Sequence, residues 1–206
     1  MATIVDVNGV VTTNLSATGI STISGLTYPS SDGSSGQYLQ TNGSGALSWQ
    51  TTTNLTRGTA VATTSGTSID FSSLPSGIRR IILLLDNVST NGTSRVVVRI
   101  GTGGTVETSG YSGSVRQDST SENMDTSFEF DLAGNASAGR QLTMFLHNIT
   151  GNIWIMSSLL GRDDLSAAAY AGGRIALGGT LDIVRITTLG GTDTFDGGTA
   201  NIFYEV

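Results

Sequence analysis

Residues 79–86 read RRIILLLD and contain the longest uninterrupted run of large aliphatic side chains in the chain. Side chains on a β-strand point alternately to the two faces of a sheet. Because both sets of alternate positions from Ile81 to Leu85 are apolar, the run predicts a strand that is buried on both faces. Arg79 and Arg80 open the run, and we expect them to mark the edge of the strand.

Further stretches downstream also alternate apolar with polar residues. They are residues 96–100, 128–132, 142–146, 153–160, 181–187 and 202–205. Turns rich in Gly, Ser and Asn separate them, and the turn at 148–152 predicts a hairpin. Only the short windows 135–140 and 165–171 favour a helix. Seven or eight strands without intervening helices predict an all-β fold, an antiparallel β-sandwich or jelly roll over residues 69–206.

Upstream of this region, residues 27–49 read TYPSSDGSSGQYLQTNGSGALSW. Asn42-Gly43 separates two short runs of alternating apolar and polar residues, which is a strong hairpin signal. An isolated two-stranded hairpin is only marginally stable in water. We therefore expect Tyr38, Leu47 and Trp49 to be buried against copies of the same hairpin, as an interface between subunits.

Two motifs carry a resemblance to a known family. The pattern SDGxxGQxLxTxGxGxLxW, at residues 31–49, resembles a connector of tail-fibre and related appendage proteins of tailed bacteriophages. The ending LDxVRITT…GTDTFDxGxxNIxYE, at residues 181–205, is similar to the end of terminal domains in the same proteins. The resemblance implies a homotrimer that is part of the virion. The short chain also leaves room for a head fibre or a capsid decoration protein.

The resemblance and the composition together predict three regions. Residues 1–50 carry thinly spaced apolar residues and an Asn8-Gly9 turn signal, which predict an extended, intertwined β segment that trimerises and docks to the virion. Residues 51–68 are polar and predict a linker with one weak strand at 55–62. Residues 69–206 are the predicted head domain.

The composition excludes several classes of function. The formal net charge is −6, and all ten basic residues are arginine, so the clustered cations that bind phosphate backbones are missing and we expect no nucleic-acid partner. Zero cysteines exclude disulfides, thiolate metal sites and cysteine nucleophiles. No stretch approaches the roughly 20 apolar residues of a membrane span, and the first residues lack a secretory pattern. We expect synthesis in the host cytoplasm, no membrane insertion and a final place on the virion.

Few residues of the chain could carry an enzymatic function. His147 is the only histidine, and no strand–helix nucleophile elbow accompanies it, so a structural or surface role is favoured. The pair Asp163-Asp164 and the acidic loop 118–125 could serve glycoside hydrolysis, but adjacent loop aspartates point in different directions. We predict no catalytic residue and no cofactor, and keep a small polysaccharide depolymerase as a third alternative.

Two further motifs suggest ligands. Asp193 and Asp196 could bind calcium, although aspartate in a Gly/Thr turn ordinarily caps backbone amides, so no metal site is predicted. The run 101–104, GTGG, superficially resembles a phosphate-binding loop. Such a loop is followed by a helix and a lysine, and neither follows here, so the run is interpreted as a turn.

Aromatic residues in loops supply the candidate contacts to a receptor. Tyr111 and Tyr170 lie beside small residues, and tyrosine is suited to stacking on sugars, so both are candidate glycan or receptor contacts by analogy with the family. The sequence thus favours a non-enzymatic, homotrimeric virion protein that contributes to host attachment. The alternative is a decoration or cement protein, or a head fibre, that stabilises the capsid.

Overall fold

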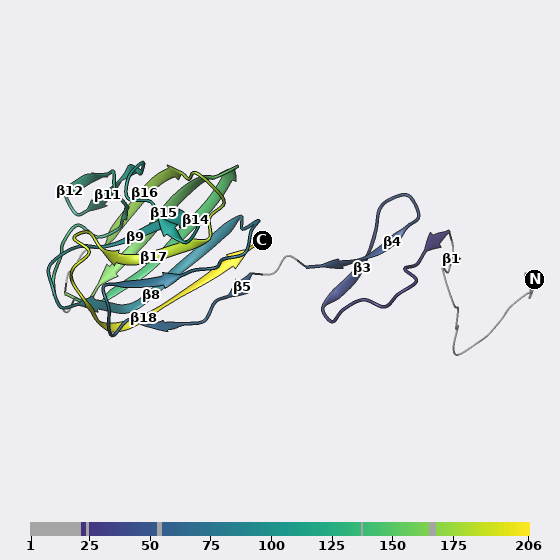
Figure 1. Ribbon diagram of the computed structural model, residues 1–206, viewed down its shortest axis with the longest axis horizontal. Helices are drawn as coiled ribbons and strands as arrows, with labels where there is room; N and C mark the ends of the chain where they lie inside the picture. Colours follow the sequence, from purple (N-terminus) through teal and green to yellow (C-terminus); the bar gives the residue numbers. More distant parts are fainter. Residues whose placement is uncertain (1–21, 24, 53–54, 137, 165–167) are drawn as a thin grey trace, which may run out of the picture. The chain divides into compact units, whose positions relative to one another are not determined.

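The computed structural model describes residues 22–23, 25–52, 55–136, 138–164 and 168–206. The chain divides between residues 53 and 54 into two compact units (Figure 1). The described residues form strands and no helix, which confirms the predicted all-β class. None of these residues belongs to a helix that could cross a membrane. The predicted thin β-structure and Asn8-Gly9 turn lie within residues 1–21, outside the described residues.

The first unit contains two strand pairs. The strands are β1 (Thr22–Ile23), β2 (Leu26–Thr27), β3 (Gln37–Thr41) and β4 (Leu47–Thr51). β3 and β4 pair antiparallel across the Asn-Gly turn, so the predicted hairpin is confirmed. The side-chain oxygen of Asn42 accepts hydrogen bonds from the backbone N–H groups of Ser44 and Ala46, at 2.8 and 3.1 Å. Gly43 and Gly45 take the positive φ values that the reversal needs.

The second unit, the head, is built on two antiparallel sheets. The larger sheet has nine strands: β12 (Thr120–Met124), β11 (Ser112–Gln117), β16 (Ala169–Ala176), β15 (Ile153–Arg162), β14 (Arg140–Thr150), β8 (Arg80–Thr90) and β18 (Phe195–Glu205) in spatial order, with β5 (Thr56–Arg57) and β6 (Val61–Ala62) both on the edge of β18. The smaller sheet consists of β10 (Thr105–Val106), β9 (Val96–Thr102), β17 (Ile183–Thr188) and β7 (Ser68–Phe71), with β13 (Phe128–Glu129) also on β9.

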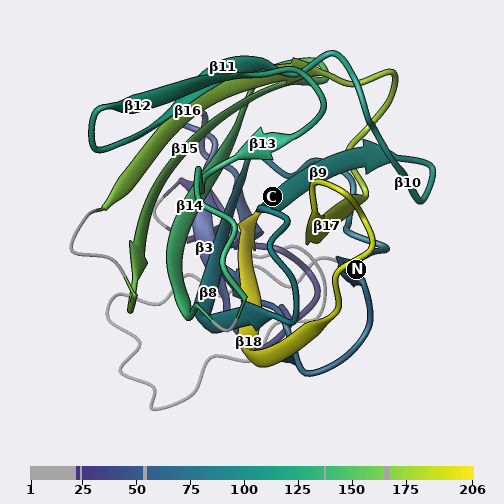
Figure 2. The same cartoon turned by 90° about the vertical axis from the view of Figure 1, so that its left-hand side faces the viewer.

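Figure 2 shows the larger sheet curling around β9 and β17 of the smaller one. Alternate side chains of both sheets meet between them. Leu83, Met144 and Leu146 come from the larger sheet, and Val98 and Ile186 from the smaller one, and all five are fully buried. The head is therefore the predicted sandwich, closed by burial of aliphatic side chains between two layers.

The prediction that the aliphatic run of β8 is buried on both faces is wrong. Ile81, Leu83 and Leu85 point into the core, whereas Ile82 and Leu84 lie on the opposite face and remain partly exposed. The physical reason is that the smaller sheet covers only the concave face of the larger sheet. Within the described part of the head, no second layer lies over the convex face.

The structure also differs from the prediction that residues 51–68 form a polar linker. β5 and β6 both lie inside residues 51–68, and both pair with β18. The weak strand expected at 55–62 is therefore two short strands at the edge of the larger sheet. Residues 56–62 belong to the head and are not a free connection.

Candidate interaction surfaces

The hairpin of the first unit distributes its large side chains over two faces. Leu39 pairs with Trp49 across the ladder, and Tyr38 pairs with Gln50. Since neighbouring residues of a strand point to opposite faces, Leu39, Leu47 and Trp49 share one face and Tyr38 lies on the other. Leu39 was missed as an interface candidate, although the register set by the Asn-Gly turn predicts its place.

Trp49 also fixes the turn that precedes the hairpin. Its indole N–H donates a hydrogen bond of 2.9 Å to the carbonyl of Ser31. A Cβ atom on Gly33 would lie 2.6 Å from the indole ring, so glycine is required for this close packing. Tyr38 remains 44% exposed in the single chain. Burial of Tyr38, Leu47 and Trp49 between copies stays a prediction.

The convex face of the head carries a group of apolar side chains, called here the outer patch. Its members come from β18, β8, β14 and β15 and lie on neighbouring strands of one face: Ile82, Leu84, Phe145, Ile155, Leu159 and Phe203. Phe145 and Phe203 flank Ile82 in register, one on each side. Leu159 is 60% exposed although it is a large aliphatic side chain.

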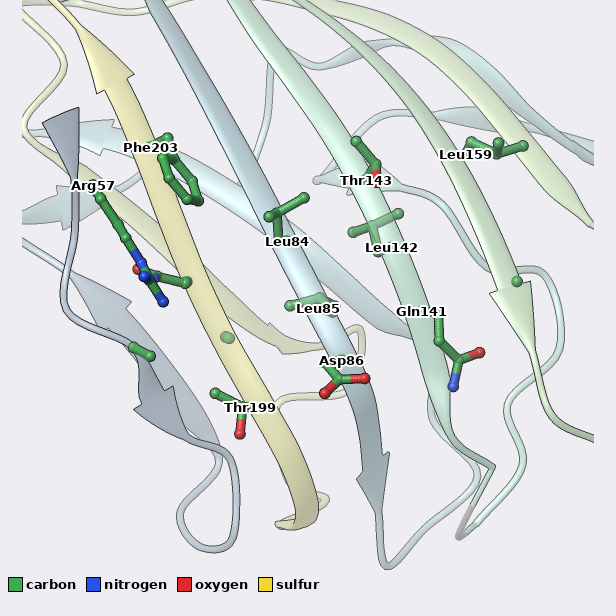
Figure 3. Close-up of a pocket in the computed structure, with 14 residues that line it drawn as sticks. Arg57, Leu84, Leu85, Asp86, Gln141, Leu142, Thr143, Leu159, Thr199 and Phe203 are labelled. Atoms are coloured by element: carbon green, nitrogen blue, oxygen red, sulfur yellow. The ribbon is translucent and has the colours of Figure 1, made fainter. Parts of the chain in front are cut away.

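A groove of about 560 Å³ opens beside three members of the outer patch, Leu84, Leu159 and Phe203. Figure 3 shows Leu84 on its floor, Phe203 and Arg57 on one side and Thr143 and Leu159 on the other. The guanidinium carbon of Arg57 lies 5.9 Å from the centre of the Phe203 ring, in a cation–π arrangement. The groove thus combines apolar with polar side chains, and one cation, Arg57, and one carboxylate, Asp86, line it.

The two tyrosines proposed as receptor contacts have different environments. Tyr170 is 57% exposed on β16, next to Leu159 across the ladder, and stays a candidate contact. Tyr111 is only 4% exposed, and its ring meets that of Phe128 edge-on, 4.9 Å between centres. It presents no surface to a ligand, so its assignment as a glycan contact is corrected.

Tyr111 instead stabilises the smaller sheet. Its hydroxyl oxygen accepts a hydrogen bond of 2.9 Å from the backbone N–H of Ile100 and lies 3.3 Å from the carbonyls of Ile100 and Glu107. Burial raises the pKa of Tyr111, so the phenol stays protonated and can donate to one of these carbonyls.

We expect Tyr111→Phe to lower the free energy of unfolding by about 1–3 kcal/mol, because the buried N–H of Ile100 loses its acceptor. Urea unfolding followed by fluorescence measures this loss. Tyr170→Phe is the matched control, since its hydroxyl is on the surface, and should change stability by about 0.5 kcal/mol or less. Weakened host binding with unchanged stability in Tyr111→Phe would restore Tyr111 as a contact.

The residues considered as catalytic candidates form ring contacts, hydrogen bonds or ion pairs with other residues of the head. His147 lies on the convex face, where its ring stacks on that of Phe145 with 6.1 Å between centres. A carboxylate oxygen of Asp163 accepts a 2.8 Å hydrogen bond from the backbone N–H of Gly139. Glu122 forms an ion pair with Arg95, which lowers the pKa of Glu122.

Glu129 shares the same arginine. Its carboxylate lies 3.1 Å from the Arg95 guanidinium and is nearly buried, and this burial raises the pKa of Glu129 despite the cation. Arg95 therefore lies between two carboxylates, Glu122 and Glu129, whose pKa values shift in opposite directions. Among the described residues, no three acidic or histidine side chains gather as a metal site.

The aspartates of the C-terminal motif bind to the neighbouring loop. A carboxylate oxygen of Asp193 accepts a 2.7 Å hydrogen bond from the backbone N–H of Ser94, the capping role that the turn context favours. Asp196 accepts a 2.5 Å hydrogen bond from the hydroxyl of Ser89. The run 101–104 forms the predicted turn, with positive φ at Gly103 and Gly104.

A buried ion network closes one end of the sandwich. Asp131 has no exposed side-chain surface and binds two arginines, Arg140 at 2.6 Å and Arg162 at 2.9 Å. Arg162 also binds Asp164 through two parallel hydrogen bonds of 2.9 and 2.7 Å. Hydrogen bonds from Arg162 and then from Asn135 lower the pKa of Asp164 to about 2. The network ties the loop that follows β13 to the ends of β14 and β15.

Comparison of the chain with family models, with curated proteins and with solved structures finds no match in any of the three. The function must therefore be inferred from the chain's own motifs and surfaces.

Proposed function

We propose that the protein is a non-enzymatic, homotrimeric structural protein of a tailed-phage virion, a short fibre-like appendage that contributes to host attachment. The observation that carries this proposal is the division of the chain into two compact units. The motif at residues 31–49 forms a hairpin in a unit of its own, and that unit precedes an all-β head. A docking segment followed by an outward head is the organisation that attachment requires.

The first unit supports assembly from several copies. Its hairpin has one apolar face with Leu39, Leu47 and Trp49, and Tyr38 on the other. A two-stranded hairpin has little to bury within one chain. Three copies around an axis would cover these side chains, and the first 26 residues would dock the trimer to the particle.

The head also supports a structural function, because several of its aspartates form hydrogen bonds and ion pairs within the fold. Asp193 binds Ser94 in the loop between β8 and β9, and Asp196 on β18 binds Ser89 near the end of β8. Asp131 neutralises two buried arginines. Tyr170, exposed on β16, remains the candidate for contact with a host glycan or protein.

Phage particles that lack the protein test the proposal directly. We expect them to adsorb to host cells several times more slowly than complete particles, and the full chain supplied in trans to restore adsorption. A chain that lacks residues 1–26 should keep a folded head yet fail to enter particles. Adsorption kinetics and particle composition are the measurements.

Two results would point elsewhere. Normal adsorption with DNA release at lower temperature would identify a capsid cement protein, the alternative function. Release of reducing sugar from host polysaccharide by the purified protein, lost in Asp163→Asn, would identify a depolymerase. Gly139 supplies a backbone contact to Asp163, so the folded state of this variant is checked by circular dichroism.

A further inference from the structure

The groove on the convex face gathers polar side chains that are not used inside the fold. They come from β5, β8, β14 and β18, and they are Arg57, Asp86, Gln141, Thr143 and Thr199. Within the described part of the chain, none of these side chains forms a hydrogen bond or an ion pair. Their neighbour Asn201 differs, since its side-chain oxygen accepts a 2.8 Å hydrogen bond from the backbone N–H of Ile202. Donors and acceptors from four strands are therefore left open toward one hollow.

Polar and apolar surface lie at different ends of this groove (Figure 3). At one end, Thr199 and Asp86 pair across the β18–β8 ladder, and Gln141 lies on the next strand. Toward the other end, the partly exposed ring of Phe203 and the aliphatic side chain of Leu84 line the groove. A ligand in the groove would meet hydrogen-bonding groups and apolar carbon at the same time.

The groove has the size of a ligand site. Its volume of about 560 Å³ lies within the roughly 300–1,000 Å³ of small-molecule sites. From β18 to β15 the lining crosses three strand spacings, which at about 4.8 Å each make about 14 Å. Gly161 keeps the β15 side open, because a Cβ atom there would meet only the side-chain oxygen of Gln141, at 3.8 Å. An elongated ligand therefore has room across four strands.

The charges of the lining indicate the class of ligand. Arg57 and Asp86 are the two charged residues that line the groove, so their charges cancel and a strongly charged ligand is not favoured. Sugar hydroxyls both donate and accept hydrogen bonds, and the C–H groups of a sugar ring pack on aromatic and aliphatic side chains. We infer that the groove binds a neutral oligosaccharide.

The inference rests on the proposed function for the source of this ligand, the surface of the host cell. It also gives Tyr170 a place in the site. Tyr170 pairs with Leu159 across the β15–β16 ladder, and Leu159 lines the groove. An oligosaccharide that passes Leu159 would meet the exposed ring of Tyr170 next.

Two glycines of the convex face provide a matched pair of variants. Gly161 lines the groove, whereas Gly172 lies on β16 outside it. Neither glycine takes a positive φ. A Cβ atom would have no heavy atom nearer than 3.8 Å at Gly161 and 3.9 Å at Gly172, chain neighbours aside. Valine suits strands, so we expect both Gly161→Val and Gly172→Val to fold, and circular dichroism checks this.

Binding is measured on the full-length protein with an array of neutral and acidic oligosaccharides prepared from bacterial surface polysaccharides. Titration calorimetry with the neutral oligosaccharide that binds then gives the affinity of each variant. We expect Gly172→Val to bind as the unchanged chain does, and Gly161→Val to bind about tenfold or more weakly because its side chain fills the groove. Asp86→Asn should also bind about tenfold more weakly, because a charge-assisted hydrogen bond is lost.

The outcomes separate the groove from the proposed function. Equal affinity of Gly161→Val, Asp86→Asn and the unchanged chain would overturn the inference, as would binding of acidic oligosaccharides alone. No binding at all would overturn it too, while slow adsorption of particles that lack the protein would still support attachment. Binding that Gly161→Val abolishes, together with normal adsorption of such particles, would support the groove and overturn attachment.

Discussion

Asp131→Asn should lower the free energy of unfolding of the head by about 3–5 kcal/mol. The substitution keeps the shape of the side chain but removes the one carboxylate that lies between Arg140 and Arg162, both of which are buried. Two buried cations would then face each other across the β14–β15 ladder, where they are directly paired. Urea unfolding followed through the buried Trp154 measures the change.

Asp70→Asn is the matched control for this prediction. Asp70 binds Arg185 through two hydrogen bonds of 2.6 Å, but both side chains are about one-third exposed. Removal of this surface pair should cost about 1 kcal/mol or less. If Asp131→Asn proved as mild as Asp70→Asn, the buried network would not hold the end of the sandwich.

Phe128→Ala should have an effect of similar size, a loss of about 3–5 kcal/mol. Phe128 is fully buried between the sheets, contacts the ring of Tyr111 and pairs with Val98 of the smaller sheet. Its truncation leaves a cavity that neighbouring strands, held by their ladders, cannot fill. Calorimetry or urea unfolding gives the loss.

Phe128→Leu provides the comparison, because it keeps most of the buried volume and should cost about 1.5 kcal/mol or less. A similar loss for both variants would mean that the aromatic contact with Tyr111 matters more than the filled volume. A small loss for both would mean that the core collapses around the site.

The sequence predicted those parts of the fold that depend on local pattern. The Asn42-Gly43 hairpin and the β14–β15 hairpin were both recognisable because turn chemistry and period-two alternation act over a few residues. The exposed side of β8 was not predictable in this way. Whether Ile82 is covered depends on how many layers the fold stacks, and the alternation of one strand carries no such information.

The candidate site residues show the same difference between what local sequence determines and what distant strand pairing determines. Tyr111 has loop neighbours in sequence, yet its hydroxyl binds Ile100 on another strand, so its burial depends on a distant pairing. The buried network was also beyond sequence reasoning, because Arg140 and Arg162, the two arginines that bind Asp131, come together only when β14 and β15 pair. The side of the hairpin on which Leu39 lies was predictable from register.

The position of β18 has a consequence for how the molecule is made. This last strand lies inside the larger sheet, between β8 and the two strands that begin the head, and β17 lies between β9 and β7. The first and last segments of the head are thus direct neighbours, and such distant pairings form slowly. β8 has no partner on this side until β18 has been synthesised. Closure of the head must therefore wait for β18, and the first unit, which emerges earlier, can meet its copies before any head is complete.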